Sequence, residues 1–169
     1  MIPDLKGVIS IADWYLEDIE GNLHKAFFIE VARKDVGKMK WERKISWGRE
    51  LTYGKQDGRK VYKLVDSATK MIHGGISMRD AVDHVFIHLI ESATHNREDP
   101  RRFINVTRLL IAFAGMRSVD IGADGFLALE PKTGLENYYA DRYKAYSLTG
   151  RKVGIAGPVT KYWIRVYYK

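Results

Sequence analysis

The stretch HLIESATHNREDPRRFINVTRLLIAFA, residues 88–114, joins three chemically different segments. An apolar run closes on Glu91, an arginine-rich polar segment follows, and a run with helical spacing begins after Asn105. This order predicts a strand, a loop and the start of a helix. The first N–H groups of a helix lack helical partners and carry the positive end of its dipole, so the loop is suited to hold a pyrophosphate. A solvated basic turn is the alternative, because Glu98 and Asp99 offset part of the charge.

The segments around this loop predict an α/β fold with a mixed, mostly antiparallel sheet and flanking helices. After the loop, apolar residues at i, i+3, i+4 and i+7 predict a helix packed on a sheet, and a strand-helix-strand order implies a parallel crossover. Thr133 followed by Glu136 has the spacing of a capping box. The expected strands are residues 26–33, 60–66, 70–78, 84–92, 124–131 and 161–169, and the expected helices begin at Asn105 and span 133–146.

Length and composition predict one domain that covers residues 1–169. The chain is 46% hydrophobic and 29% charged, and no low-complexity segment offers a linker. It contains no cysteine, which excludes disulfides and thiolate chemistry. The N-terminal apolar stretch is interrupted by acidic residues and lacks a basic leader, so we expect neither secretion nor membrane insertion. A cytoplasmic location is the expectation.

The charge of the chain is basic and unevenly distributed. Its formal net charge is +7, and residues 141–169 hold seven basic side chains against one acidic side chain. Such a face attracts nucleic acid or a phosphate-rich cofactor, or it is only solvated. A nucleic-acid-binding domain would use Tyr162, Trp163 and Tyr167 as stacking surfaces on this face.

Residues 41–146 resemble the GNAT superfamily of acyl-CoA N-acyltransferases, in particular a compact bacterial subgroup. The motifs that carry the resemblance are, in order, Trp41 and Trp47 before VYKLVD, then IHGGIS, HLIESATHN, INVTRLLIAFA and DGFLALEPKTGLENYYADRYKA. The resemblance implies the GNAT fold, acetyl-CoA as co-substrate, and acetyl transfer to a primary amine of a small molecule or protein. It also leaves open a homodimer.

The resemblance also places the cofactor. The central strand of such proteins separates from its neighbour and binds the pantetheine arm, here through Leu89, Ile90 and Glu91. The family's loop usually contains glycines, whereas this sequence has none, and Asn105 is the residue there that best tolerates a left-handed backbone. The residues expected at the phosphates are Arg101, Arg102, Phe103, Ile104, Asn105, Val106, Thr107 and Arg108.

Two side chains are the candidate catalytic groups. Tyr139 occupies the position of the family's helix tyrosine and is the candidate acid that protonates the leaving thiolate. Glu91 is the candidate base, with His88 as a weaker alternative. The competing interpretation is a core tyrosine and an ion-paired carboxylate. His84, His88 and His95 have no recognisable ligand spacing, so no metal is expected.

Two other functions compete with the enzyme. A catalytically inactive acyl-CoA-binding or regulatory protein would keep the fold without the chemistry, and the basic nucleic-acid-binding domain is the second rival. The acceptor pocket of such folds comes from the N-terminal segment, here residues 1–55. Its aromatic residues, Trp14, Tyr15, Trp41 and Trp47, either line that pocket or fill the core, and the core is favoured.

Overall fold

The computed structural model describes residues 12–169, and these form a mixed sheet flanked by helices. The sheet has eight strands in the order β1-β2-β3-β4-β5-β6-β8-β7. The strands are β1 (Trp14–Glu17), β2 (Leu23–Glu30), β3 (Lys60–Asp66), β4 (Ile72–Asp80), β5 (Val85–Ser92), β6 (Leu127–Leu129), β7 (Tyr146–Ser147) and β8 (Val153–Ile155). The helices are α1 (Trp47–Asp57), α2 (Val106–Asp120), α3 (Glu136–Tyr143) and α4 (Gly157–Tyr167), with short 3₁₀ turns η1 (Arg33–Lys38) and η2 (Thr94–Asn96).

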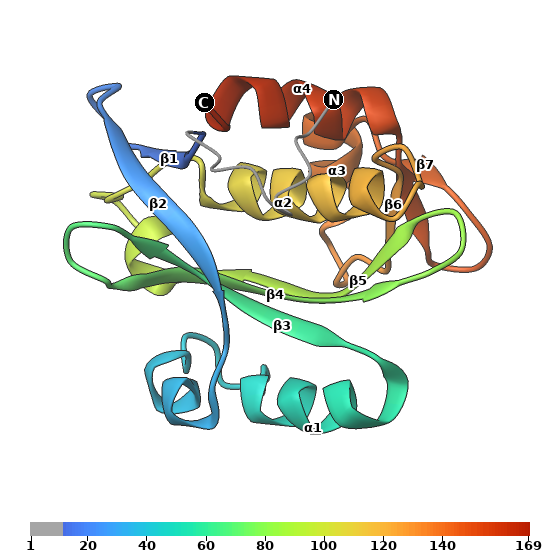
Figure 1. Cartoon of the computed structure of the whole chain (residues 1–169), viewed down its shortest axis with the longest axis horizontal. Helices are drawn as coiled ribbons and strands as arrows, with labels where there is room; N and C mark the ends of the chain where they lie inside the picture. The colour runs from blue at the N-terminus through green and yellow to red at the C-terminus, as the bar shows by residue number, and fades with distance from the viewer. Residues whose placement is uncertain (1–11) are drawn as a thin grey trace.

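The predicted mixed, mostly antiparallel sheet is confirmed. Strands β1 to β5 pair antiparallel with their sequence neighbours, whereas β5 and β6 pair parallel through the α2 crossover. Figure 1 shows the layers: η1 and α1 cover one face of the sheet, and α2 lies on the other face with α4 outside it. This crossover places the start of α2 next to the carboxyl end of β5.

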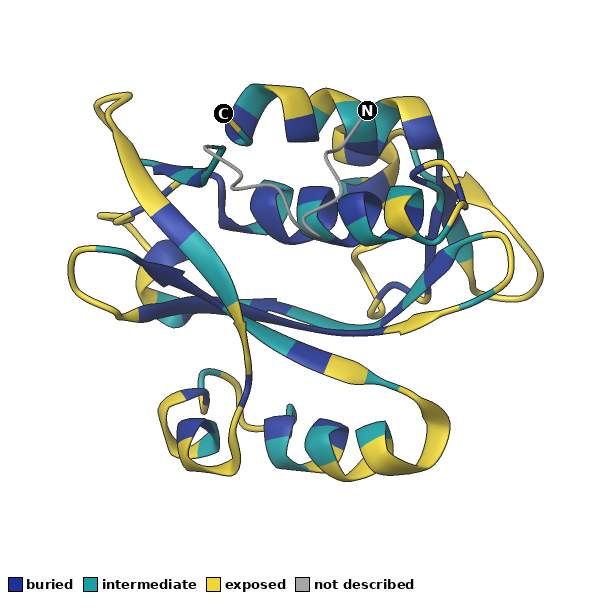
Figure 2. Cartoon of the chain, viewed as in Figure 1, coloured by how far each residue is buried: buried dark blue, intermediate teal, exposed yellow. Residues whose placement is uncertain are grey.

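Helix α2 is the centre of the larger core. Leu109, Leu110 and Ile111 are all fully buried although they are consecutive and therefore point to different sides of the helix. This is possible because α2 lies between the sheet and α4 (Figure 2). A smaller core on the opposite face contains Met39 and Trp47 beneath α1. The prediction of core positions is confirmed for Trp14 and Trp47, which are buried, whereas Tyr15 and Trp41 are only half-buried.

The predicted C-terminal strand 161–169 is wrong, because this segment lies in helix α4. Pro158 stands in the first turn, where its missing N–H costs nothing, and Thr160, Ile164 and Tyr167 form a buried stripe at helical spacing. The aromatic and β-branched residues favour a strand locally, but packing against α2 decides the outcome. The last strand along the chain is β8 instead, and it pairs with β6.

The predicted capping box at Thr133 is also absent. Helix α3 begins at Glu136 with Leu135 as its N-cap, and the Glu136 carboxylate accepts a hydrogen bond from the N–H of Gly134 at 3.0 Å. The Thr133 hydroxyl instead accepts a hydrogen bond from Arg151 at 3.1 Å. The helix is therefore shorter than the predicted 133–146.

Helix α1 lies in a segment whose pattern is ambiguous. The Ser46 hydroxyl caps it by accepting the N–H of Arg49 at 3.2 Å, and Gly58 ends it with a left-handed backbone (φ 80°).

Across residues 12–169, no helix has the length and apolar character that crossing a bilayer requires. No cluster of three or more His, Cys, Asp or Glu side chains suited to a metal ion occurs within this same range.

Candidate active site

A cleft opens where β5 and β6 separate. Pairing between these strands covers only Val85–Ile87 with Leu127–Leu129, although β5 continues to Ser92. The register of β5 against β4 also shifts between Leu89 and Ile87, which leaves His88 as a bulge residue. The resulting cavity has a volume of about 560 Å³.

The predicted pantetheine-binding residues lie in this cleft. Leu89, Ile90 and Glu91 line its wall and come after the last residue of β5 that pairs with β6. Their backbone groups on that side have no β6 strand beside them. An extended ligand could therefore pair with this segment as an added strand would.

Glu91 is a buried carboxylate at the end of the open strand, only 5% exposed. Its Oε1 accepts a 2.8 Å hydrogen bond from the indole N–H of Trp47, whereas Oε2 is buried and accepts none from the described residues. Burial raises the pKa of Glu91, and the Trp47 hydrogen bond and the nearby Lys132 partly oppose this effect. Such a carboxylate has an oxygen free to accept a proton.

Two glycines of β4 make this arrangement sterically possible. Gly75 is the cross-strand partner of Glu91, and a Cβ there would lie 2.9 Å from the Trp47 ring and 2.8 Å from Met39 Cε. On the opposite face, a Cβ at Gly74 would lie 2.9 Å from Val106 Cγ1 at the start of α2. The GG pair thus lets both the indole and α2 approach the sheet closely.

A second carboxylate, Glu42, lies at the cleft and is held by cations from distant segments. Lys132 Nζ approaches its Oε2 at 3.1 Å, and Arg97 approaches the same oxygen at 3.7 Å. All three side chains line the cleft. The hydrogen bond from Lys132 lowers the pKa of Glu42, so this group is anionic beside the buried Glu91. Arg97 belongs to the arginine-rich loop that the sequence already indicates, whereas Glu42 and Lys132 carry no local sequence signal because their proximity depends on tertiary structure.

Tyr139 lines the cleft from helix α3 and is 4% exposed. Its ring lies 5.2 Å from Tyr138 and 6.0 Å from Tyr143. Burial raises its pKa well above the ordinary value, so the phenol stays protonated. A protonated phenol and a buried carboxylate therefore line the same cleft.

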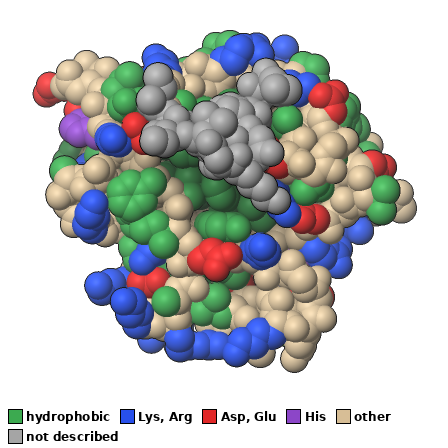
Figure 3. Space-filling model, viewed as in Figure 1, with side chains coloured by type: hydrophobic (Ala, Val, Ile, Leu, Met, Phe, Trp, Pro, Cys, Tyr) green, Lys and Arg blue, Asp and Glu red, His purple; other side chains and the backbone are tan. Residues whose placement is uncertain are grey.

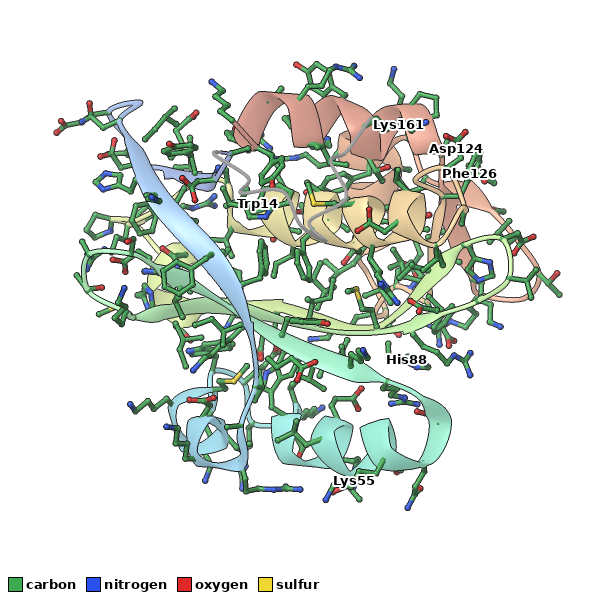
Figure 4. All side chains as sticks on the ribbon, viewed as in Figure 1. Trp14, Lys55, His88, Asp124, Phe126 and Lys161 are labelled. Atoms are coloured by element: carbon green, nitrogen blue, oxygen red, sulfur yellow. The ribbon has the colours of Figure 1, made fainter. Side chains whose placement is uncertain are left out.

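His88 also lines the cleft, as the alternative base. Figure 4 shows it projecting from β5 on the side of the sheet that faces α1. Burial, with a contribution from Arg59, lowers its pKa to about 4, so it is neutral near pH 7. Its Nε2 is buried without a hydrogen-bond partner among residues 12–169.

The β5–α2 loop contributes most of its predicted phosphate-binding residues to the cleft. The first helical hydrogen bond of α2 runs from Leu109 N to Asn105 O, so the N–H groups just before it have no helical acceptor. Arg102 and Asn105 do not line the cleft. Those that do are Arg101, Phe103, Ile104, Val106, Thr107 and Arg108.

Asn105 connects the start of α2 to strand β1. It is fully buried, its Oδ1 accepts the N–H of Glu17 at 2.8 Å, and its Nδ2 donates to the carbonyl of Tyr15 at 3.1 Å. Its φ is −118°, so the tolerance of asparagine for a left-handed backbone is not used at this position. Positive φ outside glycine is confined, within residues 12–169, to Lys70, Asp124 and Lys144. The loop thus reaches this conformation without needing glycine.

Comparison with solved structures decides the fold. An acetyltransferase of the GNAT family from Staphylococcus aureus Mu50 superposes with a TM-score of 0.51 at 11% identity, covering 76% of this chain and 97% of that one. The chain has the GNAT fold. AtaTR bound with AcCoA gives a TM-score of 0.55 at 8% identity (81% and 96% covered), and AtaT complexed with acetyl-methionyl-tRNAfMet gives 0.57 at 9% (82% and 98%).

These likenesses concern the fold alone. No protein-family model matches the sequence, and no curated protein matches it either. The superpositions confirm the predicted GNAT fold, whereas the bacterial subgroup stays a prediction.

Behind the loop of this GNAT fold lies a buried polar network around His73, which is 0% exposed. Its Nε2 lies 2.8 Å from Asp66 Oδ2, and its Nδ1 lies 2.9 Å from His95 Nε2. Asn96 Nδ2 is 3.1 Å from the same Nδ1, and Asn96 Oδ1 accepts the N–H of Phe103 at 2.9 Å. The network thus fixes the loop between β5 and α2.

The electrostatics of this network keep His73 neutral. Burial lowers the pKa of His73 to about 4, despite the hydrogen bond with Asp66. Burial raises the pKa of Asp66, but hydrogen bonds from Thr69 and His73 outweigh it and bring the pKa to about 2. The pair is therefore a neutral imidazole against a carboxylate near neutral pH.

The C-terminal aromatic residues do not form the stacking face of the nucleic-acid rival. Tyr167 is buried, and Trp163 packs against it and lies under the guanidinium of Arg108 at 4.9 Å. Of the three, Tyr162 alone is largely exposed, at 50%. Helix α4 uses its aromatic side chains mainly for packing.

Proposed function

We propose that this chain is an N-acetyltransferase that moves the acetyl group of acetyl-CoA to a primary amine. The observation that carries the proposal is the cleft between β5 and β6, which is lined by both the buried Glu91 carboxylate and the protonated Tyr139 phenol. A protein of the same fold, AtaTR, is solved with AcCoA bound. The proposed chemistry thus matches both the geometry and the fold.

The cleft has groups suited to bind the pantetheine arm, the pyrophosphate and the thioester of acetyl-CoA. The pantetheine arm would pair with the backbone of Leu89–Glu91, where β6 has departed. The pyrophosphate would lie at the first turn of α2, near Thr107 and the guanidinium groups of Arg101 and Arg108. This arrangement places the thioester between β5 and α3.

The transfer itself needs one base and one acid. The neutral amine nitrogen attacks the thioester carbonyl carbon, a C–N bond forms and the C–S bond breaks. Glu91 Oε2 takes the proton that the amine loses, and Tyr139 supplies a proton to the departing thiolate. Burial raises the pKa of a thiol as well as that of the phenol, so proton transfer to sulfur is less uphill than the phenol's pKa alone suggests.

Glu42 and Lys132 hold the outer part of the cleft. Their ion pair joins the segment before α1 to the loop after β6. An acceptor that arrives as an ammonium would compete with Lys132 for the Glu42 carboxylate before it reaches Glu91. An ammonium would thus have to displace Lys132 from Glu42 at the mouth of the site.

The decisive experiment combines calorimetry with a turnover assay. Acetyl-CoA is titrated into the purified protein, and release of free CoA thiol is then followed with a panel of small amines, lysine peptides and aminoacylated tRNA. Micromolar binding with amine-dependent thiol release supports the enzyme. Binding without turnover on any amine identifies the inactive binding protein, and no binding at millimolar ligand overturns both.

A further inference from the structure

The residues from η1 through α1 form a surface of one charge sign, which we name the η1–α1 surface. Figure 3 shows Lys and Arg side chains gathered along this end of the molecule, and Figure 4 shows Lys55 pointing away from the sheet. Eight of its cations are exposed and form no ion pair with an acidic side chain among residues 12–169: Arg33, Lys34, Lys38, Lys40, Arg43, Lys44, Arg49 and Lys55.

The acidic side chains of the same segment are engaged elsewhere. Asp35 is buried and accepts Lys63 Nζ at 2.9 Å, and Glu50 is buried and accepts Arg59 at 2.9 Å. Glu42 pairs with Lys132 in the cleft, and Asp57 at the end of α1 pairs with Arg59 at 2.9 Å. Because these carboxylates pair with cations outside the η1–α1 surface, the eight exposed cations face solvent without an acidic partner.

The η1–α1 surface continues into the active-site cleft. Glu42 lines the cleft, and Arg43 and Lys44 follow it directly in the chain. The Thr94 hydroxyl donates to the Trp41 carbonyl at 3.3 Å, which holds this segment against the end of β5. A long anion lying along α1 would therefore present its end at Glu42 and Glu91.

We propose that the η1–α1 surface binds the phosphate backbone of an RNA whose terminal amino acid supplies the acceptor amine. The proposal rests on the proposed acetyltransferase function and names its acceptor. A row of uncompensated cations matches a polyphosphate chain. The exocyclic amines of bases are poor nucleophiles because their lone pair is delocalised, so a nucleic acid that offers an aliphatic amine is an aminoacylated RNA.

The chemistry of such an acceptor suits Glu91. An α-amino group has a pKa near 8, so about a tenth of it is neutral at pH 7, whereas less than about a thousandth of a lysine amine is. Its nitrogen attacks the acetyl carbonyl carbon, the C–S bond breaks, and free CoA thiol and N-acetyl-aminoacyl-RNA are the products. The proton lost from nitrogen goes to Glu91 and the sulfur gains one from Tyr139, so the step needs no other reactant.

The test measures binding of fluorescently labelled bulk tRNA, aminoacylated or deacylated, to the full chain over a range of salt. The double variant Arg43→Glu with Lys44→Glu reverses two charges beside the cleft without changing a residue that lines it. The matched control is Arg165→Glu with Lys169→Glu, which makes the same change in net charge at α4, on the other side of the sheet (Figure 1). Calorimetry with acetyl-CoA on all three proteins reports separately on the cofactor site.

We expect the natural chain to bind tRNA with a steep salt dependence and to acetylate only the aminoacylated form. The Arg43→Glu, Lys44→Glu variant should bind at least tenfold more weakly with unchanged acetyl-CoA affinity, while the α4 control binds as the natural chain does. Equal weakening by both variants, or no binding at low salt, overturns the RNA surface. Displacement of the labelled tRNA by polyglutamate at equal charge would overturn the RNA proposal in favour of an acidic protein. If the natural chain does not bind acetyl-CoA in the calorimeter, the proposed function is overturned instead.

Discussion

The indole N–H of Trp47 donates a 2.8 Å hydrogen bond to Glu91 Oε1, joining residues 44 positions apart. This bond stabilises the charged carboxylate and opposes the effect of burial on its pKa. Replacing Trp47→Phe should therefore raise the pKa of Glu91 further, so that kcat/KM for amine acetylation begins to fall at higher pH as the solution is acidified. Trp14→Phe, also in the core, should leave the pH profile in place; a Trp47→Phe profile identical to that of the natural chain would remove Glu91 as the base.

The neighbouring tyrosines of α3 separate a catalytic role from a packing role. Tyr139→Phe removes the proposed proton donor while keeping the ring, so kcat should fall at least tenfold, about 1.4 kcal/mol or more in activation free energy. Acetyl-CoA affinity should change little. Tyr138→Phe removes a half-buried hydroxyl on the same helix and should keep near-normal kcat. Equal turnover in all three proteins contradicts the assignment.

The two adjacent arginines of the β5–α2 loop provide a matched pair for the phosphate site. Arg101 lines the cleft, whereas Arg102 does not and its guanidinium lies 5.6 Å from the Phe103 ring centre. Arg101→Ala should weaken acetyl-CoA binding about tenfold, as expected for loss of a charge-assisted hydrogen bond. Arg102→Ala should weaken it less than twofold. Calorimetric titration of both variants measures the difference, and the reverse order would move the phosphate site.

The neutral state of His73 makes the fold sensitive to acid. Its pKa is about 4 in the folded protein and near 6.5 when unfolded, so between these values the unfolded chain binds the extra proton and stability falls with decreasing pH. This group should remove about 1 to 2 kcal/mol of stability between pH 7.5 and pH 5.

Thermal or urea unfolding at both pH values measures that loss. His73→Gln keeps a donor toward Asp66 but cannot titrate, so its stability should depend less on pH over this window. His84→Gln changes a half-buried histidine bound to Asp83 and should behave as the natural chain does. An unchanged pH dependence in His73→Gln would contradict the role of His73.

The elements with strong local patterns were predictable from the sequence. The strand 60–66 and the helix after Asn105 have clear periodicity, and the structure contains both. The segment of α4 was misread because the buried stripe of Thr160, Ile164 and Tyr167 is hidden among β-favouring residues. Propensity is a weak guide where tertiary packing decides.

Some residues of the candidate site could likewise be predicted from the sequence, and others could not. Glu91 and Tyr139 lie near recognisable motifs, so the sequence alone could nominate them. The Glu42–Lys132 pair spans 90 residues, and nothing in its local sequence indicates that the two side chains meet. For α1, Ser46 and Gly58 are the local sequence signals of the two helix ends.

Asn105 gives strand β1 a part in the chemistry of a site that it does not line. Its side-chain amide bonds to backbone groups of Tyr15 and Glu17 much as a neighbouring strand would, and Ile104 N donates to the Glu17 carbonyl at 2.9 Å. The position of the first turn of α2 is thus set by the opposite end of the chain. A change in β1, whether by mutation or by a bound partner, would be transmitted directly to the groups proposed to bind the cofactor phosphates.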